Sequence, residues 1–111
     1  SVMSSESVLK FVEETNKLNR KQVLIVGDAI LSFLIAPASI NFQEQVSTIA
    51  TEQQISGSSI KVIAQGLLLT FQEALNNSYS LQRLGERCTE LGFETEAVSA
   101  LMKVWKVQAV G

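Results

Sequence analysis

The sequence predicts an all-α protein, a compact orthogonal bundle of about six helices. Three observations support this fold class. Apolar residues recur at spacings of three and four, the period of a helix with one buried face. No stretch between turns alternates with the period of two that a half-buried strand requires. Apolar residues make up 46% and charged residues 18% of the 111 residues, which favours a folded globule over a disordered chain.

The first predicted helix spans residues 6–18. Ser4 or Ser5 fits as its N-cap, because a serine hydroxyl accepts a hydrogen bond from a backbone N–H that has no partner inside the helix. Its apolar side is expected to consist of Val8, Leu9, Phe11 and Val12. This side is thin in the first turn, so we expect the start of the helix to fray.

The second predicted helix, residues 20–36, is apolar nearly all round and should therefore lie at the centre of the bundle. Asn19 can cap its start. Pro37 ends it, because proline lacks an amide proton and disfavours helix in the residue before it. The apolar residues are Val23, Val26, Ile30, Phe33 and Leu34 on one face, and Leu24, Leu31 and Ile35 on another.

The third and fourth predicted helices form the next part of the bundle. Ser39 is the expected N-cap of the third, which is amphipathic and peripheral, with Phe42, Val46, Ile49 and Ala50 at helical spacing. A turn at residues 56–59 supplies the cap of the fourth, residues 59–75. The fourth helix should pack on the second and complete the core. Its expected buried residues are Ile60, Ile63, Ala64, Leu67, Leu68 and Phe71.

Two shorter helices are predicted at the end of the chain. Residues 81–91 place Leu81, Leu84, Cys88 and Leu91 in line, and Gly92 suits a left-handed C-cap. The final helix, residues 96–108, is expected to bury Val98, Leu101, Met102 and Trp105, while Val104 and Val107 widen its apolar stripe.

The sequence contains little of the chemistry that an enzyme or a metal site requires. Histidine is absent, which removes the commonest general base and the commonest metal ligand. Asp28 is the only aspartate, so no calcium-binding loop is present. Cys88 shares a stripe with leucines and has no histidine to activate it, and we interpret it as a core residue. We therefore predict that the protein is not an enzyme and has no catalytic residues, cofactor or metal site.

Charge and hydropathy exclude further classes of partner. The net charge is −2 and no run of three basic residues occurs, so we expect no nucleic-acid partner. The longest apolar run, residues 23–36, contains Asp28 and is shorter than the roughly 20 residues that cross a bilayer. A single cysteine excludes an internal disulfide and suits a reducing compartment, so we expect a cytoplasmic protein.

Three residues inside the predicted helices have two interpretations each. Asp28 is expected either at the solvent edge of its helix or bonded to the end of a neighbouring helix, since an unpaired buried carboxylate is costly. Gly27 and Gly66 indicate close approach of the second and fourth helices. The alternative is a small-molecule binding bundle with a ligand cavity between those two helices.

The last helix is the candidate partner-binding surface, because it has more apolar surface than one face of a bundle needs. The candidate residues are Val98, Leu101, Met102, Val104, Trp105 and Val107. Trp105 and Met102 fit equally as a hot spot for a partner, where tryptophan is enriched, and as part of the domain's own core. Nearby, Glu90, Glu94 and Glu96 are interpreted as a solvated face at a helix start.

The order of several segments resembles that of COMM domain-containing proteins. The final segment, residues 91–106, reads LGFETEAVSALMKVWK and is similar to the end of that family's helical N-terminal domain. The other matching segments, in order, are residues 33–37, 46–56, 66–69 and 74–78. The resemblance covers about residues 18–106.

This resemblance implies a six-helix N-terminal domain at residues 4–108, with residues 1–3 either added residues or the native start at Met3. In the family a COMM domain follows, which assembles with other members. It is absent from this chain, so we expect the isolated chain to be a monomer. The resemblance also implies a scaffold subunit of the Commander assembly, which contains coiled-coil domain-containing proteins and supports endosomal recycling of membrane cargo.

The family is also linked to restraint of NF-κB signalling, and the resemblance implies a cytoplasmic location with endosomal association and a nuclear pool. Copper binding has been associated with one member. A copper site needs clustered histidine, cysteine or methionine ligands. Histidine is absent here and Cys88, Met3 and Met102 are scattered, so we do not extend copper binding to this chain.

Overall fold

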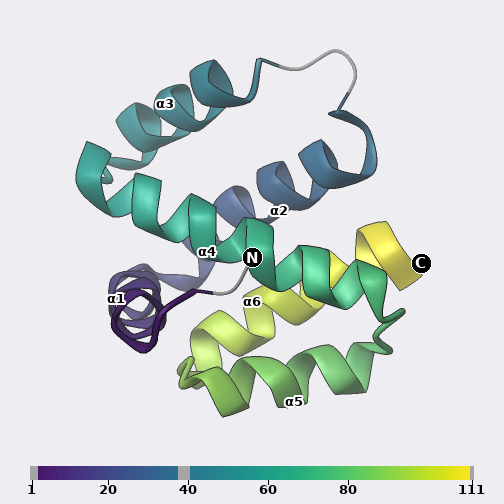
Figure 1. Cartoon of the computed structure of the whole chain (residues 1–111). Helices are drawn as coiled ribbons and strands as arrows, with labels where there is room; N and C mark the ends of the chain where they lie inside the picture. Colours follow the sequence, from purple (N-terminus) through teal and green to yellow (C-terminus); the bar gives the residue numbers. More distant parts are fainter. Residues whose placement is uncertain (1–2, 38–40, 111) are drawn as a thin grey trace.

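A computed structural model describes residues 3–37 and 41–110, and within them the chain forms six α-helices and a final π-helical turn, with no strand. The all-α fold class is therefore confirmed (Figure 1). The elements are α1 (Ser5–Asn16), α2 (Arg20–Ile35), α3 (Phe42–Gln53), α4 (Gly57–Asn76), α5 (Leu81–Leu91), α6 (Thr95–Trp105) and η2 (Lys106–Val110).

The first five helices each have an N-cap side chain at their start. The caps are Ser4, Asn19, Asn41, Ser56 and Ser80, and each accepts a hydrogen bond from the backbone N–H three residues ahead. Such caps satisfy N–H groups that have no partner within the helix. The cap of α3 is Asn41, whereas the expected Ser39 lies outside the described residues. Ser4 and Asn19 cap their helices as expected.

Cap residues determine where several of the helices begin and end. Helix α5 has the predicted bounds and ends at Gly92, whose φ of 104° is left-handed. Helix α4 begins two residues earlier than predicted because Ser56, rather than a later residue of the turn, is its cap. Helix α6 ends as an α-helix at Trp105 and widens into the π-helical turn η2, instead of continuing to residue 108.

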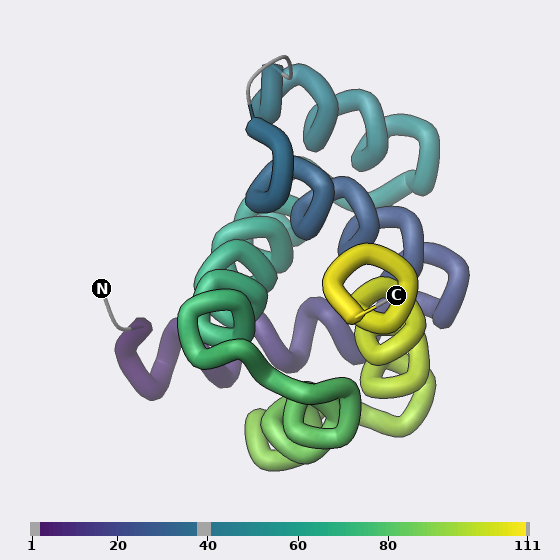
Figure 2. The backbone as a smooth tube through the Cα atoms, turned by 90° about the vertical axis from the view of Figure 1, so that its right-hand side faces the viewer, coloured from purple at the N-terminus to yellow at the C-terminus, as the bar shows by residue number. Residues whose placement is uncertain are grey.

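Helix α2 occupies the centre of the bundle, as expected, and contacts α3, α4 and α6. In Figure 2, α6 is seen nearly end-on with α2 above it and α5 below it. Helix α1 packs against α4. The largest fully buried side chains come from all of these helices except α3 and include Phe11, Ile30, Leu31, Ile63, Leu67, Phe71, Leu84, Leu101 and Trp105.

Gly27 and Gly66 allow close approach of their helices, but to helices other than the predicted pair. A Cβ at Gly66 would lie 2.2 Å from the ring of Phe11 in α1. A Cβ at Gly27 would lie 3.2 Å from Leu101 in α6. The prediction that both glycines mark the contact of α2 with α4 is therefore wrong. The alternative, a ligand cavity at these glycines, is not observed either, because side chains fill the space beside each.

Asp28 agrees with its expected position, whereas Leu9 does not. Asp28 is exposed, and its carboxylate accepts a hydrogen bond of 2.6 Å from Gln108 Nε2 in the last turn. It thus lies at the solvent edge and also bonds a neighbouring helix end. Leu9, expected on the apolar side of α1, is 61% exposed instead. The buried side of α1 runs through Phe11 and Val12.

A buried carboxylate connects α1 to α4. Glu14 accepts hydrogen bonds from Lys17 Nζ at 2.8 Å and from Ser59 Oγ at 2.6 Å, and Lys10 Nζ lies 3.5 Å away. Hydrogen bonds from Lys17 and Ser59 lower the pKa of Glu14 from 4.5 to about 2, against the opposing effect of its burial. The ionised form of Glu14 is therefore favoured in the folded protein.

We predict that Gly66→Ala lowers the free energy of unfolding by about 1–3 kcal/mol or more, because the added methyl group must displace Phe11 from the core. Urea denaturation at 25 °C measures this change. Gly57→Ala is the matched control, since a Cβ there meets nothing within 4 Å. Its stability should be unchanged or higher by up to about 1 kcal/mol. Equal effects of the two variants would contradict the close contact of α1 with α4.

We predict that Glu14→Gln destabilises the protein near neutral pH and that its difference from the wild type shrinks as pH falls. The folded-state pKa lies below the ordinary value, so the stability from Glu14 is fully present above pH 4.5 and is lost as pH falls toward about 2. Urea denaturation across this pH range measures the difference. Glu52→Gln, which removes an exposed carboxylate from α3, is the control. A difference independent of pH would overturn the assignment.

Candidate partner-binding surface

The six candidate residues of the last helix lie in three different environments. Leu101, Val104 and Trp105 are 0%, 3% and 2% exposed and belong to the core. Val98 and Met102 are half-buried on the side of α6 that faces α5. Val107 is 60% exposed on η2. The structure therefore does not bring the six residues together into one surface, and three of them have almost no area to offer a partner.

Trp105 closes the core of the bundle. Its indole ring stacks on Phe71 of α4 with ring centroids 6.0 Å apart and planes 8° from parallel. Its Nε1–H donates a hydrogen bond of 3.1 Å to the carbonyl oxygen of Tyr79, before α5. A buried indole N–H normally finds such a partner. Of the two interpretations of Trp105, the structure supports the core.

Two adjacent stripes of α6 explain this division. Ala97, Ala100, Leu101 and Val104 recur at spacings of three and four and are all buried. Val98 and Met102 lie one residue further round the helix and form a second stripe with the same spacing. Leu101 and Val104 of the first stripe lie against Gly27 of α2, whereas Met102 of the second stripe lies against Gly85 of α5.

A groove of about 650 Å³ runs between α5 and α6. Its lining includes Leu81, Gly85, Thr89, Val98 and Met102, with Glu86 and Glu90 beside them. A Cβ at Gly85 would lie 2.7 Å from the sulfur of Met102, so the missing side chain is what lets Met102 rest on α5. Sequence reasoning missed the contribution of α5. Gly85, a glycine within a predicted helix, was the available signal.

A second hollow, of about 330 Å³, continues the groove around α6. It shares Thr89, Val98 and Met102 with the groove and adds Phe93 from the turn before α6. We call the two hollows together the α5–α6 groove. Val107 is not among the residues that line either hollow.

The rim of the α5–α6 groove is acidic but locally paired. Arg83 Nη1 lies 3.0 Å from Glu90 and 3.6 Å from Glu86. The hydrogen bond from Arg83 lowers the pKa of Glu90, and the same bond raises the pKa of Arg83. Glu90 is therefore an ion-paired residue and not only part of a solvated face. Glu94 and Glu96 are exposed, as expected.

The turn between α5 and α6 is held by α1. Asn16 Nδ2 donates a hydrogen bond of 3.2 Å to the carbonyl oxygen of Gly92. The backbone N–H of Glu94 donates one of 2.9 Å to Asn16 Oδ1. Glu94 occupies the N-cap position of α6 but makes no side-chain cap bond. Asn16 thus orients the helix pair that forms the groove.

Comparison with known proteins decides the family. The family model described as the HN domain of COMMD2-7/10 matches residues 3–105, nearly the whole chain. The chain belongs to the COMM HN domain family. The family resemblance seen in the sequence is thereby confirmed.

The curated relatives of this HN domain are longer than the chain itself. COMM domain-containing protein 7 of Homo sapiens is 29% identical over 105 residues, which cover 94% of this chain and 52% of that protein. The same protein of Mus musculus is 28% identical with the same coverage. The chain therefore spans about half the length of the curated relatives it matches. No solved structure matches it.

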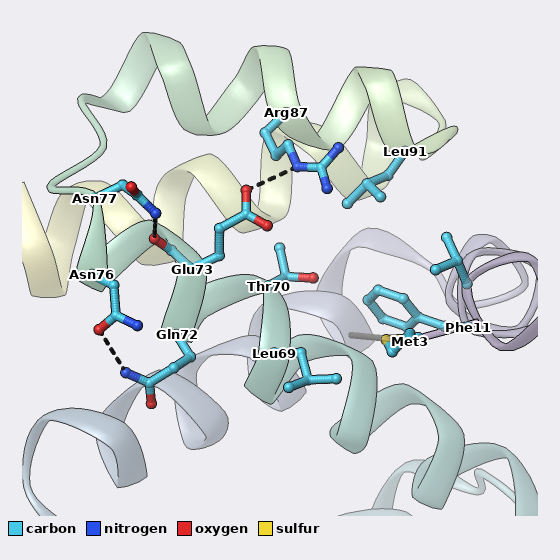
Figure 3. A pocket seen from close by; sticks show the side chains of 11 residues that line it. Met3, Phe11, Leu69, Thr70, Gln72, Glu73, Asn76, Asn77, Arg87 and Leu91 are labelled. Atoms are coloured by element: carbon cyan, nitrogen blue, oxygen red, sulfur yellow. Dashed lines mark hydrogen bonds and ion pairs between the residues drawn. The ribbon is translucent and has the colours of Figure 1, made fainter. Parts of the chain in front are cut away.

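A third hollow of this HN domain, about 390 Å³, lies among α1, α4 and α5 (Figure 3). Glu73 lies at its polar end, where Tyr79 donates a hydrogen bond to the carboxylate and Arg87 Nε donates another of 3.0 Å. Burial raises the pKa of Glu73, but the bonds from Tyr79 and Arg87 outweigh it and lower the pKa overall. The bond to Glu73 raises the pKa of Tyr79. We interpret this network as a connection between α4 and α5.

Cys88 is fully buried in α5, in agreement with its interpretation as a core residue. Burial raises the pKa of its thiol to about 12, so the reactive thiolate is nearly absent at neutral pH. Within residues 3–37 and 41–110, no three His, Cys, Asp or Glu side chains are grouped so that they could hold a metal ion. None of the described helices is long and apolar enough to cross a bilayer.

We predict that Trp105→Ala lowers the free energy of unfolding of this HN domain by about 3–5 kcal/mol, because it removes the largest fully buried side chain. Chemical denaturation followed by circular dichroism measures the loss. Trp105→Phe keeps a ring against Phe71 but leaves the Tyr79 carbonyl without its donor, so its cost should be lower, about 1–3 kcal/mol. An unchanged denaturation midpoint for Trp105→Ala would contradict the assignment of this side chain to the core.

Proposed function

We propose that this chain is a non-enzymatic scaffold domain of a COMM-family subunit in the Commander assembly. In this proposal residues 4–108 form its helical N-terminal domain. The observation that carries the proposal is the match of residues 3–105 to the HN domain family. The subunit would support endosomal recycling of membrane cargo and restraint of NF-κB signalling, with a cytoplasmic and endosome-associated location and a nuclear pool.

The α5–α6 groove is the docking surface in this proposal. It retains two of the six residues first considered, Val98 and Met102, and adds Leu81 and Gly85. Leu101, Val104 and Trp105 act instead by fixing the position of α6 from within the core. The partners proposed are other COMM-family subunits and coiled-coil domain-containing proteins.

The shape and chemistry of the groove suit a partner helix. Its floor is apolar, and Met102 is a side chain that adapts to different contact shapes. A helix that places apolar residues at spacings of three and four fits such a groove. Glu86 and Glu90 at the rim are already paired with Arg83, so the apolar floor is the main basis of recognition.

We predict that Met102→Glu weakens binding to a COMM-family or coiled-coil domain-containing partner by about tenfold or more, because it places a charge on the apolar floor. Biolayer interferometry with the purified partner immobilised measures the affinity. The expected melting temperature stays close to that of the wild type, since Met102 is only half-buried.

Leu9→Glu is the matched control for this experiment. It makes the same kind of change at a side chain that is 61% exposed on α1 and lies outside the α5–α6 groove. Its affinity should equal that of the wild type. If both variants bind the partner as the wild type does, the α5–α6 groove is not the docking surface. Failure of the wild-type chain to bind any of these partners contradicts the scaffold function itself.

A further inference from the structure

Helix α3 is incompletely covered by the rest of the bundle. Ala50 is its only buried residue, whereas every other α-helix buries at least three. Phe42, Val46 and Ile49 are packed against the core but remain partly exposed. The apolar stripe of α3 is therefore wider than the surface that α2 and α4 cover, and part of it faces solvent.

The uncovered side of α3 forms one wall of a groove whose other wall is α4. The groove has a volume of about 650 Å³. Figure 1 shows α3 on the side of the bundle away from α5 and α6, while α4 begins beside α3 and crosses the bundle toward the start of α5. The apolar floor comes from both helices and includes Val46, Ala50, Ile60, Ala64 and Leu68. We call this feature the α3–α4 groove.

The α3–α4 groove carries charge of one sign only among the described residues that line it. Lys61 is the only charged residue in its lining, and no described acidic side chain lies within ion-pair distance of it. The other polar lining residues are neutral. Gly57, also in the lining, is the first residue of α4 and sits at the positive end of the helix dipole. One end of the groove is therefore positive, and the rest combines apolar with neutral polar side chains.

The positive end is also open. A Cβ at Gly57 would meet no atom within 4 Å, so there is open space beside the first residue of α4. Gly57 and Lys61 are four residues apart and share one side of α4. Ala64, Gln65 and Leu68 continue that side along the groove. A carboxylate placed beside Lys61 would thus be followed directly by apolar contacts.

We propose that the α3–α4 groove binds an amphipathic helix of a partner protein, with a carboxylate of that helix paired to Lys61. Its apolar residues lie on the floor formed by Val46, Ala50 and Leu68. The length of the walls sets the length of the bound segment: from Gly57 to Leu68 the wall rises by about 17 Å, or three helical turns. Such a segment presents apolar anchors at positions i, i+4 and i+7 or i+8.

This surface is separate from the α5–α6 groove, since the two share no lining residue. The scaffold domain would then hold two partner segments at separate surfaces. The α3–α4 groove selects for an acidic residue through Lys61.

The test is a selection from a displayed library of helix-forming peptides about 14 residues long, using the immobilised wild-type chain. The expected winners carry apolar residues at the stated spacing and an Asp or Glu toward one end. Synthetic winners are then titrated into ¹⁵N-labelled chain, and the shifted amide signals should belong to α3 and α4. Winners without an acidic residue, signals shifted on other helices, or no enrichment at all would overturn the proposal.

Three variants of the chain sharpen the test. Lys61→Glu should weaken binding of an acidic winner about tenfold, because it replaces attraction with like-charge repulsion. Ser47→Trp should abolish binding, because it places a bulky ring in the groove from an exposed position of α3. Lys103→Glu makes the matched charge change on the exposed side of α6 and should leave affinity unchanged. Equal losses for Lys61→Glu and Lys103→Glu would show non-specific attraction and reject the site.

A dilution series of the chain alone tests the competing occupant. If the α3 and α4 signals shift with protein concentration in the absence of peptide, the groove is covered by a second copy of the chain and the proposal is rejected. Signals that are independent of concentration leave the groove free for a partner helix, as proposed.

Discussion

The burial of α6 against α2 is the constraint on which the rest of the structure depends. Gly27 lets the two helices approach closely, because a Cβ there would lie 3.2 Å from Leu101 and 3.5 Å from Val104 of α6. Once α6 is placed, the Trp105 ring reaches Phe71 of α4 and its N–H reaches the chain before α5. Contacts with α2, with α4 and with the segment before α5 thus fix the position of α6.

That constraint also separates the core from the functional surface. A helix has only one side to turn toward α2, so the next stripe of α6 must meet α5 or solvent. Gly85 then decides how Met102 lies on α5. At the other end of the bundle α3 buries only Ala50, and its apolar side remains partly open. The two grooves therefore have the same origin, which is apolar surface left over after the core is filled.

The sequence predicted the helices better than their partners. Residues 81–91 were predicted with the observed bounds, and Gly92 was the signal for the end of this helix; its start is capped by Ser80, which was not singled out from the sequence. The neighbour of Gly66 could not be predicted, since Phe11 lies 55 residues away and a helical period carries no information about which helix it faces. The same reason explains why Trp105 and Val98, on one apolar helix, could not be divided between core and groove before α2 and α5 were placed.

Asn16 gives the bundle a dependence that reaches from its first helix to its last. Helix α6 makes no side-chain cap bond at its N-cap residue, and the backbone N–H of Glu94 is satisfied by Asn16, 78 residues earlier. During synthesis α1 therefore leaves the ribosome long before its contact exists. The start of α6 therefore depends on a contact with α1, the helix that packs against α4. A single side chain of the first helix thus couples the beginning of the chain to its last α-helix.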